Sequence, residues 1–113
     1  WLKKLNKSGI EFHARSIFLQ GLLLNKSSKL PVKFKKYSDI FINYHQWLKK
    51  NNLNSFKACL YFISSIKFVK KIVVGVDNYL QLQDIMNLKL DKKKYNFKQL
   101  SCFNKNLIDP RNW

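Results

Sequence analysis

Two short strand-like segments, separated by a long stretch with helical periodicity, limit the folds open to this chain more than any other feature. The first spans residues 10–14, after a turn at Ser8-Gly9, and the second is the β-branched run at residues 72–76. Strands that alternate with helices form parallel sheets, and the second run suits a strand covered on both faces. Two parallel strands alone do not form a stable sheet. The order therefore predicts an α/β chain that contributes two strands to a larger sheet and folds poorly when isolated.

Helical periodicity predicts two helices between the strands and further helices outside them. Ser38 or Asp39 is expected to cap the first inner helix, and Asn54 or Ser55 the second. Residues 1–7 have the pattern of the last turns of an amphipathic helix, and Asn78 is expected to cap a short helix that runs through residue 86. Residues 26–36 and the tail from residue 88 lack a sustained period. We therefore expect a loop at 26–36 and a tail that lies across the outside of the domain.

The chain is strongly basic. Of its 113 residues, 22 are Lys or Arg and 6 are Asp or Glu, which gives a formal net charge of +16. Such a charge is typical of proteins that bind nucleic acid or anionic membranes. Only Arg15 and Arg111 are arginines, however, and the lysine runs fall at predicted element ends rather than along one helix face. This distribution indicates a solvated surface, so we do not expect nucleic acid to be a partner.

Composition also limits the class of protein. Hydrophobic residues make up 46% of the chain and aromatic residues 15%, which is too much for a disordered sequence. No apolar run is long enough to span a bilayer, and Cys59 and Cys102 lack the spacing of a metal or redox motif. We expect a cytoplasmic protein with reduced thiols, without a metal site and without a membrane partner. Because the chain begins with Trp1 rather than Met, we also expect its natural start to lie upstream.

Residues suited to binding phosphate follow both predicted strands. Ser16 stands at the carboxyl end of the first strand, where ligands of parallel sheets bind, and Gly21 lets the backbone come close to a ligand. A hydroxyl and inward-turned amides there can donate several hydrogen bonds to an anion. Gly75 permits the same close approach after the second strand, where Asn78 begins a helix. Two such loops on neighbouring strand ends can hold the two ends of one dinucleotide.

Four segments together resemble one protein family. They are Arg15-Ser16-Ile17-Phe18-Leu19-Gln20-Gly21-Leu22-Leu23; Val74-Gly75-Val76-Asp77-Asn78 with Gln81-Leu82 and Asp84; Ala58-Cys59-Leu60-Tyr61-Phe62; and Leu107-Ile108-Asp109-Pro110-Arg111-Asn112-Trp113. In order, they are similar to the segments after the seventh and eighth strands, the penultimate helix and the bacterial-type carboxyl end of the aldo-keto reductases. The resemblance implies a carboxyl-terminal fragment of a (β/α)8 TIM barrel, with its last two strands, their helices and the tail. Residues 1–113 would then be part of a domain whose amino-terminal catalytic portion is missing.

The resemblance also implies two sets of cofactor-binding residues. Arg15 would face the nicotinamide; Ser16, Leu19, Gln20 and Gly21 would line the pyrophosphate; and Gly75, Asp77, Asn78, Gln81 and Asp84 would surround the adenosine end.

Three departures from the family pattern affect this site. Arg15 replaces an aromatic residue that stacks on nicotinamide, and Ile85 replaces an asparagine that contacts adenine. Asp77 replaces an uncharged residue near the adenosine ribose. A carboxylate there suits a free 2′-hydroxyl and repels a 2′-phosphate, so the cofactor is either NADP or NAD.

The family's reaction is reversible hydride transfer between a nicotinamide and a carbonyl or alcohol. Its tyrosine, lysine, aspartate and histidine lie on segments before this chain begins, and we expect His13 and His45 to be structural. The resemblance thus implies an NAD(P)H-dependent oxidoreductase as the full-length parent, with a small carbonyl or alcohol substrate, and an inactive fragment without catalytic residues. Two alternatives stay open: a small basic nucleic-acid-binding module, and a non-catalytic barrel relative that senses a nicotinamide.

Overall fold

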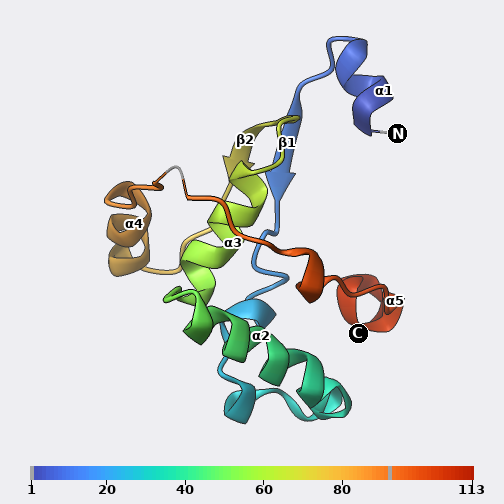
Figure 1. The fold of residues 1–113 in the computed structure, drawn as a ribbon, viewed down its shortest axis with the longest axis vertical. Coiled ribbons are helices and arrows are strands. Elements are labelled where there is room, and N and C mark those ends of the chain that lie inside the picture. Colours follow the sequence, from blue (N-terminus) through green and yellow to red (C-terminus); the bar gives the residue numbers. More distant parts are fainter. Residues whose placement is uncertain (1, 92) are drawn as a thin grey trace.

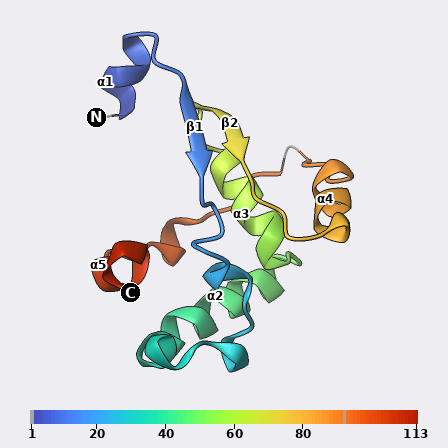
Figure 2. The ribbon, with the colours of Figure 1, turned by 180° about the vertical axis from the view of Figure 1, so that it is seen from behind.

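The computed structural model describes residues 2–91 and 93–113, and its two strands pair in parallel. β1 (Phe12–Arg15) and β2 (Val69–Val73) lie side by side, as Figures 1 and 2 show, and Arg15 is the partner of Val73. The predicted parallel pair is confirmed, but the predicted strand limits are wrong. The second strand was expected at 72–76, and it ends earlier because β1 turns away after Arg15, where Ser16 has a φ of 55°.

Two helices, α2 (Ser38–Lys50) and α3 (Ser55–Ser64), connect the strands, as predicted. The side chain of Asn54 caps α3 by accepting a hydrogen bond from the Lys57 amide at 2.8 Å. No side-chain cap begins α2, so the expected cap at Ser38 or Asp39 is wrong. The reason is that two 3₁₀ helices, η2 (Ser27–Lys29) and η3 (Val32–Tyr37), occupy much of the expected loop, and η3 runs directly into α2.

Two outer helices project from the body of the molecule (Figure 1). α1 (Leu2–Lys7) precedes β1 and corresponds to the predicted helix end, whose first residue, Trp1, lies outside the described residues. α4 (Tyr79–Met86) begins at Asn78, whose side chain accepts a hydrogen bond from the Gln81 amide at 3.0 Å, as predicted. No residue of α4 is buried, and the Tyr79 and Met86 side chains are 72% and 76% exposed.

The core lies beneath α2 and α3 rather than on the sheet. One cluster of buried side chains contains Leu22, Leu30, Phe34, Phe41 and Leu107, and a second contains Trp47, Leu48 and Ala58. Within the described part of the chain, no residue of either strand is fully buried, and Val73 is 55% exposed. The expectation that the second strand is covered on both faces is therefore wrong, since α3 lies on one side of the sheet and Figure 2 shows the other side open.

The tail crosses α2 and α3 and closes the core. It contains η4 (Lys98–Leu100), α5 (Lys105–Ile108) and η5 (Pro110–Asn112). Leu107 is 3% exposed, and Trp113 donates a hydrogen bond from its indole to the Leu107 carbonyl at 3.1 Å. The Trp113 ring also meets Phe34 edge-on, with 4.7 Å between ring centroids. The expectation that the tail lies outside the domain is therefore wrong.

The whole molecule is more extended than a typical domain of its length. Its radius of gyration is 15.0 Å, whereas about 13 Å is usual for a compact chain of this size. The two strands form an open sheet, so the structure is α/β without showing a barrel. None of the helices in residues 2–91 and 93–113 has the length and apolar character needed to cross a membrane.

Candidate functional site

A cavity of about 530 Å³ lies at the carboxyl ends of β1 and β2. Its walls are the loop that follows β1, the segment that follows β2, and the first turn of α3. Most residues that the family resemblance assigns to the cofactor line it, namely Arg15, Ser16, Gln20, Gly21, Gly75, Asp77 and Gln81. Parallel pairing thus brings together two segments that are about 60 residues apart in the chain.

The loop after β1 has an unusual backbone. Ser16, Leu19 and Gln20 have φ angles of 55°, 50° and 53°, and Gly21 has a φ of 78°. Left-handed backbone is costly for residues other than glycine and tends to cluster where a ligand is held. Short hydrogen bonds maintain the turn, from the Leu19 amide to the Ser16 carbonyl at 2.9 Å and from the Leu22 amide to the Leu19 carbonyl at 3.0 Å.

Several amides of this loop are left without a protein acceptor. Among the hydrogen bonds of the described residues, none is donated by the amides of Ile17, Phe18, Gln20 or Gly21. Changes in the sign of φ along a loop turn successive N–H groups toward a common side, which creates an anion-binding concavity. These donors are suited to a phosphate group of a dinucleotide.

The segment after β2 is held by its own side chains. The Gln81 side-chain oxygen accepts a hydrogen bond from the Asp77 amide at 2.8 Å, while Asn78 accepts one from the Gln81 amide. Both side chains therefore satisfy backbone amides at the start of α4. Gly75 has no positive φ, and a Cβ atom there would meet nothing within 4 Å, so this glycine leaves open space on the cavity side.

Three predicted site residues lie outside this cavity. Leu19 packs its side chain against the cluster that contains Leu22 and Leu107. Asn78 serves as the cap of α4, and Asp84 lies exposed on that helix without lining the cavity. Leu19 lines a second cavity instead, and its amide is used inside the turn, where it donates to the Ser16 carbonyl.

An aromatic pair in the cavity wall was missed by the sequence analysis. Phe18 and Phe56 stack with 5.3 Å between ring centroids and an interplanar angle of 25°. Both line the cavity, together with Ile85. The helical periodicity of residues 56–63 assigns Phe56 to a packed helix face. Only one feature of the sequence indicates this role for Phe56, namely its position two residues after the Asn54 cap. That position places Phe56 at the end of α3 that faces the strand ends.

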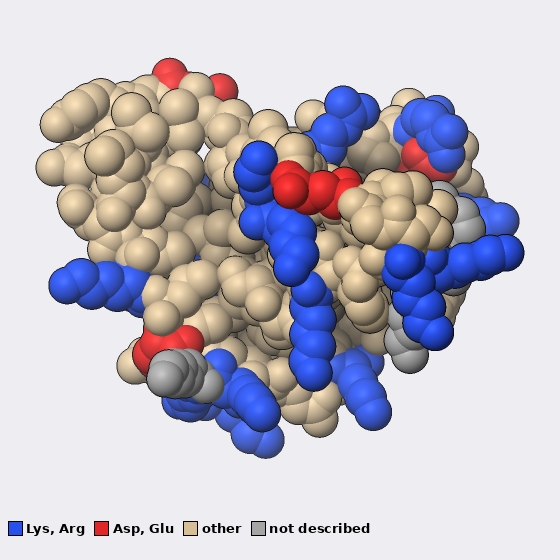
Figure 3. All heavy atoms as spheres, turned by 90° about the horizontal axis from the view of Figure 1, so that it is seen from above, with Lys and Arg blue, Asp and Glu red and all other residues tan. Residues whose placement is uncertain are grey.

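The cavity carries balanced charge in a basic molecule. Arg15 and Asp77 are its only ionisable lining groups within the described residues. Figure 3 shows lysine and arginine side chains spread around one face of the molecule, with acidic side chains between them, rather than gathered in one patch. The local charge at the cavity therefore differs from the net charge of the chain.

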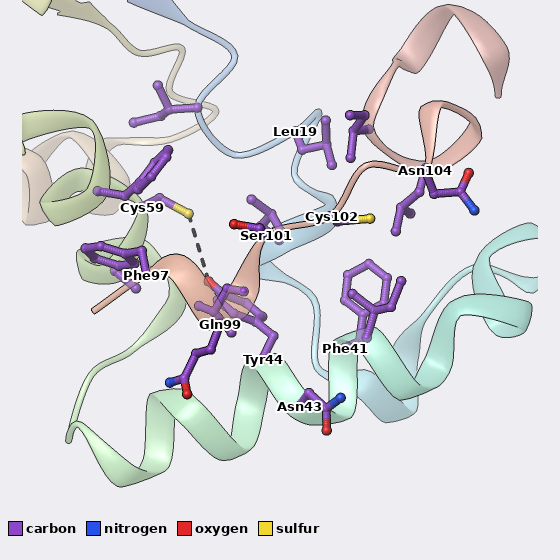
Figure 4. Close-up of a pocket in the computed structure, with 18 of the residues that line it drawn as sticks. Leu19, Phe41, Asn43, Tyr44, Cys59, Phe97, Gln99, Ser101, Cys102 and Asn104 are labelled. Carbon is purple, nitrogen blue, oxygen red and sulfur yellow. Dashed lines mark hydrogen bonds between the residues drawn. The ribbon is translucent and has the colours of Figure 1, made fainter. Parts of the chain in front are cut away.

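A second, larger cavity of about 790 Å³ lies between the loop after β1, α2, α3 and the tail (Figure 4). The Tyr44 hydroxyl lies 3.9 Å from the Cys59 sulfur in its wall. Burial raises the pKa of both the Tyr44 hydroxyl and the Cys59 thiol above their ordinary values. Both groups are therefore neutral at physiological pH.

The histidines make local contacts away from the strand ends. His13 bonds Glu11, which also pairs with Lys71 at 3.3 Å, and His45 lies 3.0 Å from the Asn25 carbonyl. The described residues contain no cluster of three side chains able to hold a metal ion.

Compared with known proteins, the chain matches no family, no curated protein and no solved structure.

Proposed function

We propose that this chain is the carboxyl-terminal, dinucleotide-binding part of an NAD(P)-dependent aldo-keto reductase. One observation supports the proposal most strongly: the loops after two adjacent parallel strands line the same cavity, where most residues assigned by the family resemblance meet. The parent enzyme would interconvert a small carbonyl compound and an alcohol. The other strands of the barrel would pair with the open edges of β1 and β2 and cover Val73.

The residues around the cavity fit a dinucleotide in three respects. The amides of the loop after β1 can donate to the pyrophosphate, and Arg15 adds a positive charge beside them. The Phe18–Phe56 pair offers an apolar wall to a ring. The Asp77 carboxylate can accept a hydrogen bond from a ribose 2′-hydroxyl and would repel a 2′-phosphate, so we propose NAD before NADP.

The nicotinamide would supply the hydride, and this chain would bind and orient it. None of the proposed residues transfers a proton. We therefore expect the isolated chain to reduce no carbonyl compound with either nicotinamide cofactor. Measurable turnover would contradict the assignment of catalysis to segments upstream.

Calorimetric titration with NAD and NADP tests the proposal directly. We expect the chain to bind NAD with a Kd of about 1 mM or lower. Gly21→Val should weaken binding about tenfold or more, because it obstructs the loop amides. Gly9→Val is the matched control, since Gly9 also has a positive φ, 76°, and open space at its Cβ but lies before β1. Equal loss in both variants, or no binding by a folded chain, would contradict the proposal.

Titration of the same protein with an oligonucleotide at several salt concentrations tests the nucleic-acid-binding alternative. A basic module would bind an oligonucleotide with an affinity that falls steeply with salt, because each phosphate contact releases counterions. We expect only weak association without sequence preference. The nicotinamide-sensing alternative predicts the same NAD titration as the reductase but no carbonyl reduction by a full-length parent.

A further inference from the structure

We infer that the larger cavity, between α2, α3 and the tail, is a binding site for an uncharged and mainly apolar small molecule. Its volume, about 790 Å³, lies within the range of about 300–1,000 Å³ that is typical of ligand pockets. Figure 4 shows side chains from four separate segments of the chain around it. This inference goes beyond the proposed function and does not depend on nucleotide binding.

The lining excludes a charged occupant. No Lys, Arg, His, Asp or Glu among the described residues lines this cavity, although 22 of the 113 residues in the chain are basic. Most of the wall is apolar and includes Ile40, Phe41, Ala58, Phe62, Ile63 and Leu100. A charged group placed there would lose its hydration without gaining a counter-ion.

One polar group in the wall, the Tyr44 hydroxyl, can orient the ligand. Asn43 on α2 and Gln99 on the tail are exposed residues at the edge of the cavity, and their amide groups point away from the Tyr44 hydroxyl (Figure 4). The Tyr44 hydroxyl lies 3.9 Å from the sulfur of Cys59, a weak partner that a ligand oxygen can replace, and it also interacts with the Ser55 side chain. This combination suits a molecule with one hydroxyl or carbonyl group on a long apolar body.

The tail wall is anchored at both of its ends. Before the cavity, Phe97 packs on Trp47, with 5.1 Å between ring centroids. After it, Leu107 is buried and bonded to Trp113. An anchored wall cannot collapse to fill the space, and atoms that line an empty apolar cavity lose packing contacts. A ligand that restores those contacts stabilises the fold.

Binding of the neutral dye Nile red to the full chain tests the inference, with displacement by 1-decanol and by decanoate. Ser101→Trp fills the cavity from its rim, and Ser64→Trp makes the same substitution at an exposed position at the end of α3, outside the cavity. We expect Ser101→Trp to weaken dye binding about tenfold and Ser64→Trp to change it by less than about twofold. We also expect 1-decanol to displace the dye at a lower concentration than decanoate does.

Two results would overturn the inference. Equal dye binding by both variants, with helical circular dichroism retained, would attribute binding to exposed apolar surface elsewhere. Displacement by decanoate at the same or a lower concentration than 1-decanol would show a site that accepts charge, in agreement with the basic surface rather than with the uncharged cavity.

Discussion

Helix caps are the feature of single residues that could be predicted from the neighbouring sequence alone. Asn54 and Asn78 each accept a hydrogen bond from an amide three residues ahead. Asn78 was predicted as a cap, and Asn54 is one of the two residues, with Ser55, that were predicted for α3. Ser38 was predicted as a cap and is not one, because the chain is already helical before it. That preceding helix depends on the burial of Phe34, which is 4% exposed in a core built from distant segments. A cap depends on residues within a few positions of it. Whether the segment before it forms a loop or a helix depends on contacts with distant segments.

Asp109 provides a test at the same scale. Its carboxylate accepts hydrogen bonds from the Arg111 guanidinium, at 2.7 Å for the shortest, and from the Arg111 amide at 3.1 Å. These bonds lower the pKa of Asp109 to about 2 from an ordinary value of 3.8. Because the folded pKa is the lower one, the interaction stabilises the tail above pH 3.8 and is lost as the pH falls through about 2.

We expect a carboxyl-carbon NMR titration to show this depressed pKa. Arg111→Gln should return the pKa of Asp109 part of the way toward 3.8, since the amide hydrogen bond remains. Arg15→Gln removes the other arginine of the chain and should leave the pKa of Asp109 unchanged. A value near 3.8 in the unmodified protein would contradict the guanidinium contact.

Among the elements, the tail and α4 differ in a way that their composition does not reveal. Both contain short helical elements and spaced apolar residues. The tail buries Leu107 and packs Trp113 on the core, while α4 buries nothing and exposes Tyr79 and Met86. Leu107 of the tail belongs to one cluster with Leu22, Phe34 and Phe41, whereas no residue of α4 is buried. Burial of an amphipathic segment therefore depends on whether another segment lies opposite it.

Replacing Leu107 with alanine tests the contribution of the tail to the core. Leu107 is 3% exposed, so Leu107→Ala should lower the free energy of unfolding by about 2–5 kcal/mol, because it leaves a cavity among apolar side chains. Ile108→Ala, at a neighbouring residue that is 42% exposed, should cost less than about 1 kcal/mol. Urea denaturation followed by circular dichroism measures both values. Equal costs would contradict the docking of the tail.

At the scale of the whole molecule, two features determine stability. A small apolar core favours the folded state, and a large net positive charge opposes it. The charge of +16 is spread over an extended shape with a radius of gyration of 15.0 Å. Ion pairs are few among the described residues, and those of Glu11 and Asp109 lie at the surface. Mutual repulsion among the lysines therefore opposes the compact state.

Salt should stabilise this molecule. Raising NaCl from about 20 mM to about 300 mM shortens the Debye length to less than about 10 Å, so it screens the repulsion between lysines. We expect the melting temperature to rise with NaCl, as measured by circular dichroism at constant pH. Sucrose at matched osmolarity controls for solute exclusion and should produce a smaller rise. A melting temperature that falls with salt would indicate that attractive ion pairs dominate.

Local sequence was sufficient for the features that depend on short-range geometry. Periodicity predicted α2, α3 and α4, hydrogen-bonding side chains predicted two caps, and the alternation of strands with helices predicted the parallel pair. It also placed Ser16 at the end of β1, beside the cavity that we propose as the dinucleotide site. Each of these features is determined by residues within a few positions of one another, or by a general rule of connection.

Contacts between distant segments decided the rest. The strand limits follow from the turn at Ser16, and the orientation of Leu19 toward the core follows from its contact with the cluster around Leu22. The Phe18–Phe56 wall and the burial of Leu107 join segments that are far apart in the chain. Apolar side chains have no directional preference of their own, so which of them become buried depends on the surfaces that the folded chain brings opposite them.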